Sequence, residues 1–168
     1  MKWLKKLLML MKRKIQTNFF CKSNYWPKRM SKINQIVKKI LKIEDISFNK
    51  KIDYILNFIF IDDKKIKLIN KTYRKKNKPT DVLTFVIYSK NHFNKIEAYC
   101  DIFFAAETIK KDANKNFTNF YDHLTHLIIH CFLHINGYSH KKKSQFVKMK
   151  KLEEKILMQL NIPSPYYL

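Results

Sequence analysis

The stretch from His126 to His140, HLIIHCFLHINGYSH, constrains this chain most strongly, because it contains the only glycine among 168 residues. His130 and His134 stand four positions apart, so on a helix both imidazoles project from one face with Cβ atoms about 5–6 Å apart. Gly137 follows the last periodic apolar residue, where a left-handed residue commonly ends a helix. We therefore expect a helix over residues 121–136 that ends in a turn at Gly137.

That turn can bring His140 back toward His130 and His134. Three imidazoles with one position left for water are typical of a catalytic zinc site rather than a structural one. His126 lies on the same helical stripe, but about 12 Å of helix rise separates it from His134, so these two cannot bind one ion. We therefore predict that His130, His134 and His140 bind one Zn²⁺, and that His126 is a neighbour of the site or a histidine satisfied in the core.

The same stretch argues against a protease of the zincin type. Those enzymes use H-E-x-x-H, in which the glutamate beside the first histidine is the general base. Here Cys131 occupies that position, and residues 126–140 contain no carboxylate. Peptide hydrolysis by that mechanism is therefore disfavoured.

The composition indicates an ordered protein of the cell interior. Hydrophobic residues make up 46% of the sequence, and no run of about 18 uncharged apolar residues exists, so we expect no stable membrane insertion. The three cysteines are widely spaced and form no C-x-x-C pair, which argues for a reducing compartment and hence a cytoplasmic location.

The formal charge of +22 permits binding to RNA. Much of it comes from lysine in a chain also rich in isoleucine and asparagine, as an AT-rich genome tends to produce, so the charge alone does not establish RNA as the partner. Only three of the 35 basic residues are arginines, and an arginine in such a background is informative because its planar fork grips phosphate. Residues 1–14 are predicted to form a basic amphipathic N-terminal extension.

Hydrophobic periodicity predicts alternating strands and helices, and hence a single small α/β domain with a three- to four-stranded sheet and about five helices. The apolar run 55–61 is expected to be a strand buried on both faces. Asp101 is an unusual charge within a strand, and such a carboxylate is normally paired or functional unless it lies at an edge. The predicted strands are 15–21, 55–61, 82–85 and 98–105. The last helix is predicted over 142–160, with Phe146, Met149, Leu152, Ile156 and Leu157 facing inward.

Three blocks of the sequence resemble one known family, the YbeY endoribonucleases, which are bacterial single-strand-specific metalloenzymes. The blocks are HCFLHINGYSH at 130–140, LINKTYRKKNKPTDVLTF at 68–85 and YCDIFFA at 99–105. Their order and spacing make the resemblance more specific than a histidine pair alone. The likeness extends over most of the chain, and we predict a YbeY-like metallo-endoribonuclease domain over residues 15–168.

The resemblance implies a mixed sheet with the zinc helix packed against it, and Arg74 at the active-site cleft. It also implies cleavage of single-stranded RNA, in particular 3′-end maturation of 16S ribosomal RNA and ribosome quality control. The expected partners are therefore single-stranded RNA, ribosomal RNA and the small ribosomal subunit.

Physical chemistry assigns roles to the matched residues. Zinc lowers the pKa of its bound water toward about 7 or polarises a phosphoryl oxygen, so His130 is expected to act in catalysis together with Arg74, which stabilises the phosphorane. Tyr73 is expected to stack on unpaired bases, as Phe85 can. The predicted RNA-binding residues are Tyr73, Arg74, Lys75, Lys76 and Lys78. No carboxylate stands out as a general base, so water and a ribose 2′-hydroxyl both remain possible nucleophiles.

The chain departs from the family pattern at three positions. Cys131 and Cys100 replace glycines, and Ser139 replaces an acidic residue whose loss can weaken a metal site about 10–100-fold. Two alternatives therefore stay open. One is a catalytically weakened, RNA-binding ribosome-assembly factor with a structural zinc; the other is a metallohydrolase with a non-RNA substrate such as a peptide.

Overall fold

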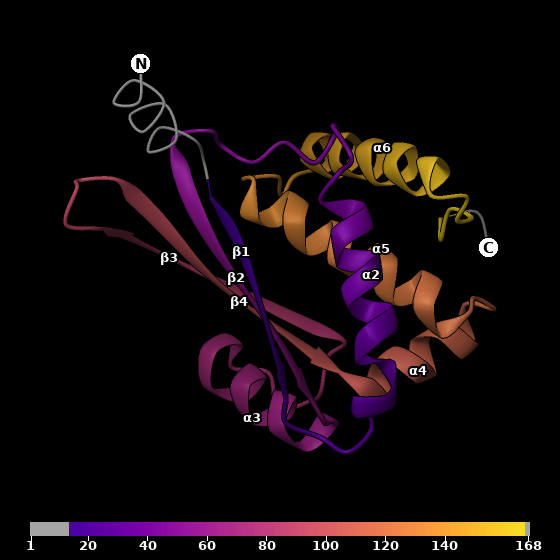
Figure 1. Ribbon diagram of the computed structural model, residues 1–168. Coiled ribbons are helices and arrows are strands. Elements are labelled where there is room, and N and C mark those ends of the chain that lie inside the picture. The colour runs from indigo at the N-terminus through magenta and orange to yellow at the C-terminus, as the bar shows by residue number, and fades with distance from the viewer. Residues whose placement is uncertain (1–13, 167–168) are drawn as a thin grey trace.

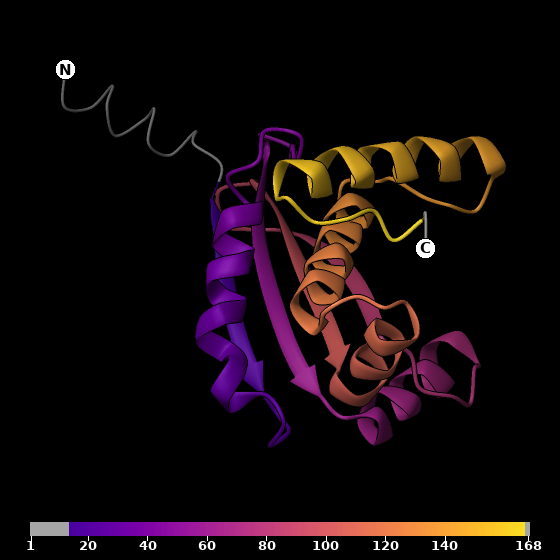
Figure 2. The same cartoon turned by 90° about the vertical axis from the view of Figure 1, so that its right-hand side faces the viewer.

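A computed structural model describes residues 14–166, and Figures 1 and 2 show how their strands and helices are arranged. The elements in chain order are β1 (Ile15–Cys21), the 3-10 helix η1 (Pro27–Arg29), α2 (Met30–Ile40), β2 (Ile52–Ile61), α3 (Asp63–Arg74), β3 (Val82–Lys90), β4 (Ile96–Ala105), α4 (Ala106–Lys115), α5 (Phe120–Ile135) and α6 (Lys143–Gln159). All of the predicted extension except Lys14 lies outside these residues, so its boundary stays a prediction.

The four strands form one mixed sheet in the order β1-β2-β4-β3. Strands β1, β2 and β4 are parallel, whereas β3 runs antiparallel to β4 and forms an edge of the sheet. Helix α2 provides the crossover from β1 to β2, since parallel neighbours need a long connection. The predicted α/β class, the mixed sheet and the placement of the histidine helix against it are confirmed.

The two faces of the sheet are covered unequally. Leu56, Phe58 and Phe60 alternate along β2 and are fully buried in the main core with residues of α2 and α5. On the other face Asn57 and its neighbours are only half-buried, and α3 covers just one end of that face through a small cluster of Ile61, Ile66, Leu83 and Ala105. The prediction that 55–61 is buried on both faces is therefore wrong, and Asn57 is the polar residue that marks the open face.

Two further differences bear on the site. Strand β3 continues to Lys90 rather than ending near residue 85, because its second half pairs with β4 in an exposed hairpin. On α6, Phe146 is 44% exposed, whereas Glu153 is 1% exposed and shares the buried stripe of Met149, Ile156 and Leu157. A carboxylate thus lies on the face where the sequence predicted only apolar residues.

Asp101 lies in an interior strand and is paired. The Asn57 amide donates a hydrogen bond of 2.7 Å to its carboxylate, and Asn57 in turn accepts one of 2.9 Å from Asn18. This chain of polar side chains crosses three strands on the open face of the sheet. Because α5 packs against the opposite face, Asp101 does not join the histidines.

Candidate metal centre

Helix α5 carries two of the three predicted ligands, and both of its ends are capped. At the N-terminus the Asn119 side chain accepts hydrogen bonds from the backbone N–H groups of Tyr121 and Asp122. Most of the helix is buried, so α5 is the central helix of the core. Few positions of α5 therefore allow a polar side chain to reach solvent.

At its C-terminus α5 ends in a Schellman motif centred on the only glycine. Gly137 has φ 86°, its N–H donates to the His134 carbonyl at 3.0 Å, and the Tyr138 N–H donates to the Leu133 carbonyl at 3.0 Å. A Cβ at Gly137 would meet nothing within 4 Å, so the requirement for glycine is conformational rather than steric. This turn reverses the chain and returns His140 toward the helix.

The three predicted ligands converge. Ligand nitrogens of His130, His134 and His140 all lie within 4.8 Å of one another. The ring centroids of His130 and His134 are 4.4 Å apart, and that of His140 lies 5.4 Å from the first and 5.0 Å from the second. His130 and His134 are half-buried whereas His140 is exposed, so the cluster opens to solvent on one side.

The hydrogen bonds of the two helical imidazoles fit a metal ion between them. His130 Nδ1 lies 2.6 Å from Glu153 Oε1, and His134 Nδ1 lies 3.0 Å from the Tyr138 carbonyl oxygen. Because both oxygens are acceptors, each Nδ1 is the donor in its contact, and each ring turns its Nε2 toward the other histidine. The two Nε2 atoms are 2.9 Å apart, an arrangement that a shared cation stabilises. Burial and then the neighbouring His130 lower the pKa of His134, which keeps that ring in the neutral form that binds metal.

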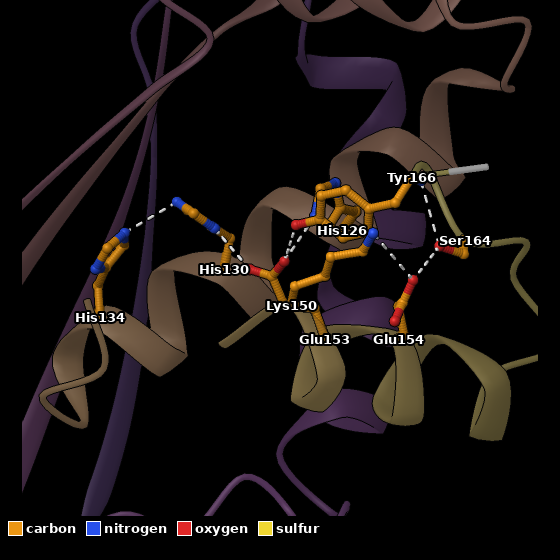
Figure 3. A network of polar contacts seen from close by, with 8 residues as sticks. All are labelled: His126, His130, His134, Lys150, Glu153, Glu154, Ser164 and Tyr166. Carbon is orange, nitrogen blue, oxygen red and sulfur yellow. Dashed lines mark hydrogen bonds and ion pairs between the residues drawn. The ribbon is translucent and has the colours of Figure 1, made fainter. Parts of the chain in front are cut away.

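Glu153 is the functional residue that the sequence reasoning missed. Figure 3 shows its carboxylate pointing from α6 toward His130, His126 and Tyr166. Burial favours the neutral acid, but hydrogen bonds from His126, His130 and Tyr166 outweigh it and lower the pKa of Glu153 to about 2. The group is therefore an anion that orients His130 through Nδ1 and leaves Nε2 facing His134. Its place on the apolar stripe of α6 was the available signal.

The segment after α6 completes this network. Tyr166 donates its hydroxyl to Glu153, and Ser164 donates its hydroxyl to Glu154 at 3.0 Å, as Figure 3 shows. Burial, followed by the hydrogen bond to Glu153, raises the pKa of Tyr166. The tyrosine therefore stays protonated and acts as a hydrogen-bond donor. The last described residues thus help to position His130, through Glu153.

His126 is a neighbour of the cluster and not part of it. Its Nε2 lies 3.4 Å from Glu153 Oε2, while its buried Nδ1 has no hydrogen-bond partner among the described residues. Its ring centroid lies 6.3 Å from that of His130. The rejection of the 126/130 pair as the metal ligands agrees with this arrangement.

Edge strand β3 separates the histidines from the basic loop that follows α3. Thr84 hydrogen-bonds the Cys131 thiol, next to His130, whereas Phe85 contacts Tyr73 with ring centroids 5.0 Å apart. Consecutive residues of a strand face opposite sides, so the loop and the histidines flank the same edge.

The predicted RNA-binding residues are all exposed, and Tyr73 is 69% exposed. Arg74 is the last residue of α3, and it forms no ion pair with another residue of the 14–166 segment. Lys75 caps the helix with φ 58°, and the buried Asn70 amide donates to the Lys78 carbonyl at 2.7 Å. The backbone of the loop is therefore held in place by these hydrogen bonds, while its charged side chains face solvent.

A groove adjoins the histidines on the side of the β3–β4 hairpin. It has a volume of about 500 Å³. Its lining residues come from the segment before β2, from the start of β2, from β3 and from the end of α5 with the turn after it, and include Lys50, Tyr54, Tyr88, His134 and Gly137. Its wall combines aromatic rings, a lysine and one histidine of the cluster, which suits a chain with bases and phosphates.

Comparison with known proteins identifies the family. The model of the family described as endoribonuclease YbeY matches residues 20–161. A Bartonella bacilliformis protein named endoribonuclease YbeY is 38% identical over 112 residues, which are 66% of this chain and 71% of that protein. One of the same name from Agrobacterium fabrum is 34% identical over 137 residues, which are 81% of this chain and 82% of that protein. The chain belongs to the YbeY endoribonuclease family.

A solved structure supports the fold. The solution structure of TM1509 from Thermotoga maritima superposes with a TM-score of 0.53 at 23% identity, over 87% of this chain and 92% of that chain. Among residues 14–166, no helix is long and apolar enough to cross a bilayer. The predicted family and fold are thus confirmed.

The three departures from the YbeY pattern leave the histidine cluster assembled. Cys131 is buried in the core, and burial raises the pKa of its thiol to about 12 although hydrogen bonding to Thr84 acts in the opposite direction. It is therefore a protonated core residue and not a nucleophile. Burial likewise raises the pKa of Cys100 to about 12.

Ser139 accepts a hydrogen bond from the Lys141 N–H at 3.3 Å and contributes no charge, but Glu153 supplies a carboxylate to the cluster from another helix.

Proposed function

We propose that this chain is a zinc-dependent, single-strand-specific endoribonuclease. The observation that carries the proposal is the convergence of His130, His134 and His140 on one point, with both helical Nδ1 atoms already engaged and one side of the cluster open. Three imidazoles and a free position are the donor set of a catalytic zinc. Membership of the YbeY family supports RNA as the substrate.

When bound, zinc supplies Lewis acidity at the scissile phosphate and lowers the pKa of a bound water. The chain's own residues set up the rest. Glu153 holds the His130 ring through its anionic carboxylate, and the Tyr138 carbonyl holds the His134 ring. Both rings are thereby fixed in the tautomer that presents Nε2, which lowers the reorganisation needed on ion binding.

The RNA is proposed to cross the β3 edge, between the histidines and the loop after α3. Arg74, exposed and without an ion-pair partner among residues 14–166, would stabilise negative charge on the phosphorane through its planar fork. Tyr73, which already lies against Phe85, would stack on an unpaired base. The sequence-independent contacts to the RNA backbone would come from Lys75, Lys76 and Lys78. The groove beside His134 would take the continuing strand.

The proposed substrate in the cell is the 3′ end of 16S ribosomal RNA, processed in the cytoplasm on the small ribosomal subunit as part of ribosome quality control. A formal charge of +22 supports a highly anionic partner such as ribosomal RNA. The sequence-independent part of such binding is electrostatic, so its affinity should fall steeply with salt concentration.

The test is cleavage of a labelled single-stranded RNA and of the same RNA annealed to its complement. His130→Ala should lower cleavage of the single strand by at least about 100-fold, because it removes a ligand and the partner of Glu153. His92→Ala is the matched control, since His92 is exposed in the β3–β4 hairpin and should leave the rate unchanged. Chelation should stop the wild-type reaction and added zinc should restore it. Equal cutting by wild type and His130→Ala would contradict the proposal.

The same proteins separate the alternatives. A ribosome-assembly factor with a structural zinc would bind the ion and the RNA, yet no cutting would depend on His130. A metallohydrolase with another substrate would turn over peptides in the presence of excess RNA. Arg74→Lys sharpens the test of the loop: it keeps the charge but loses the fork, so catalysis should fall more than RNA affinity.

A further inference from the structure

A second cluster of ligand-type side chains lies at the other end of α5. Asp81 precedes β3, Asp112 lies on α4 and His123 lies near the start of α5. One carboxylate oxygen of each aspartate and one ring nitrogen of His123 lie within 4.8 Å of one another. Three elements that are distant in sequence therefore bring two carboxylates and an imidazole to one point.

Two observations beyond proximity point to a cation-binding role for this cluster. His123 is 8% exposed, and its buried Nε2 has no hydrogen-bond partner among residues 14–166. Within the same residues, no lysine or arginine forms an ion pair with Asp81 or Asp112. The Thr80 hydroxyl and the Val82 N–H both donate to one oxygen of Asp81, which fixes the orientation of that carboxylate. Two half-buried carboxylates and a buried unpaired imidazole nitrogen are otherwise costly to hold together.

We propose that Asp81, Asp112 and His123 bind a second divalent cation of the first transition row, with Mn²⁺ as the representative ion. Carboxylate ligands favour Mn²⁺, and imidazole ligands favour Zn²⁺ and other first-row ions, so this mixed set selects a first-row ion over Ca²⁺. Metal–ligand distances of about 2.0–2.2 Å place two ligands of one ion roughly 3–4 Å apart, so only a small closure of the cluster is needed. Burial, followed by the neighbouring His126, lowers the pKa of His123 and keeps the ring in its binding form.

This ion would be structural and not a second catalytic metal. His123 and His130 are seven positions apart on one helix, a rise of about 10.5 Å. The ions of two-metal catalytic centres are only about 3.5–4 Å apart. A cation at the second cluster instead joins α4, α5 and the residue before β3. Asp81 is three positions beyond Lys78, so the ion would fix the end of the loop that follows Arg74.

The test counts Mn²⁺ ions by electron paramagnetic resonance in full-length proteins. The double variant His134→Ala/His140→Ala removes the first site and should still bind one Mn²⁺ per chain. Adding Asp112→Asn to it should weaken that binding at least about 10-fold. Adding Glu44→Gln instead, which also removes one carboxylate but at an exposed position, should leave binding unchanged. Absence of Mn²⁺ from the double variant, or equal binding with and without Asp112→Asn, would overturn the proposal.

Thermal melting gives a second readout, in proteins whose first cluster (His130, His134 and His140) is left unsubstituted. Without metal, Asp112→Asn should melt at the same or a higher temperature than wild type, because it removes one of two facing carboxylates. Both proteins are then loaded with zinc and given an excess of Mn²⁺. The melting temperature of wild type should rise, and that of Asp112→Asn should not. An equal gain in both proteins would contradict a site at Asp112. The outcome is independent of RNA cleavage, so it separates this inference from the proposed function.

Discussion

The two ends of helix α5 hold histidines in different ways. At the C-terminal end, His130 and His134 are spaced by one helical turn, and the chain itself supplies the third imidazole six residues after the second. At the N-terminal end, His123 meets carboxylates from α4 and from the residue before β3. The first cluster is a local product of helix spacing and a glycine turn. The second exists only once the fold has formed, so it depends on packing that local spacing does not reveal.

The largest effect should come from removing the group that orients a ligand at the C-terminal end. Glu153→Gln keeps the shape but loses the anion that His130, His126 and Tyr166 share. Zinc affinity should fall about 10–100-fold, as for other partners of metal-bound imidazoles. Competition with a chromophoric chelator measures this directly.

The neighbouring carboxylate provides the control for that experiment. Glu154→Gln changes the adjacent residue of the same helix, which hydrogen-bonds Ser164 and not a histidine. Its zinc affinity should match that of wild type. If both variants lost zinc affinity equally, the loss would result from the lower negative charge of α6 and not from the broken contact between Glu153 and His130.

A smaller effect is expected at the turn that closes the C-terminal cluster. Gly137→Ala places a Cβ on a residue with φ 86° and should lower the free energy of unfolding by about 1–2 kcal/mol. For a chain of this length the melting temperature should fall by about 2–8 °C. Gly137→Asn should cost less, since asparagine tolerates left-handed backbone. Because nothing lies within 4 Å of the added Cβ, a loss far larger than this would show that the turn is limited by packing.

The smallest effect is expected at the opposite cap. Asn119→Ala removes the side-chain acceptor for two backbone N–H groups at the start of α5 and should lower the free energy of unfolding by about 1 kcal/mol. Asn119→Ser retains a capping oxygen and should recover most of that loss. Urea unfolding measures both variants, and zinc affinity should not change in either. A change in zinc affinity would mean that the two ends of the helix are coupled.

The sequence predicted the C-terminal cluster because its information is local. The i, i+4 spacing of His130 and His134 and the single glycine after them are visible in eleven residues, 130–140, and the structure brings these residues together. The partner of His130 was missed because Glu153 lies 23 positions away, on another helix, among residues that otherwise predict an apolar stripe. The cluster around His123 was missed for the same reason.

The differences in the sheet also have physical causes. An apolar run such as 55–61 predicts burial, but it does not say how many helices will cover each face. With α3 reaching only one end, Asn57 on the second face remains half-buried and pairs with Asp101. Strand β3 was predicted too short because its second half is exposed, and the pairing with β4, rather than its own hydrophobicity, keeps it extended.

The most direct test of the account is a crystal structure of the zinc-loaded protein with an anomalous difference map at the zinc edge. We expect a peak about 2.0–2.1 Å from Nε2 of both His130 and His134 and from a ring nitrogen of His140, with a solvent oxygen completing a tetrahedron. A peak at which His140 is turned away, or at which a fourth protein side chain fills the open position, would contradict it.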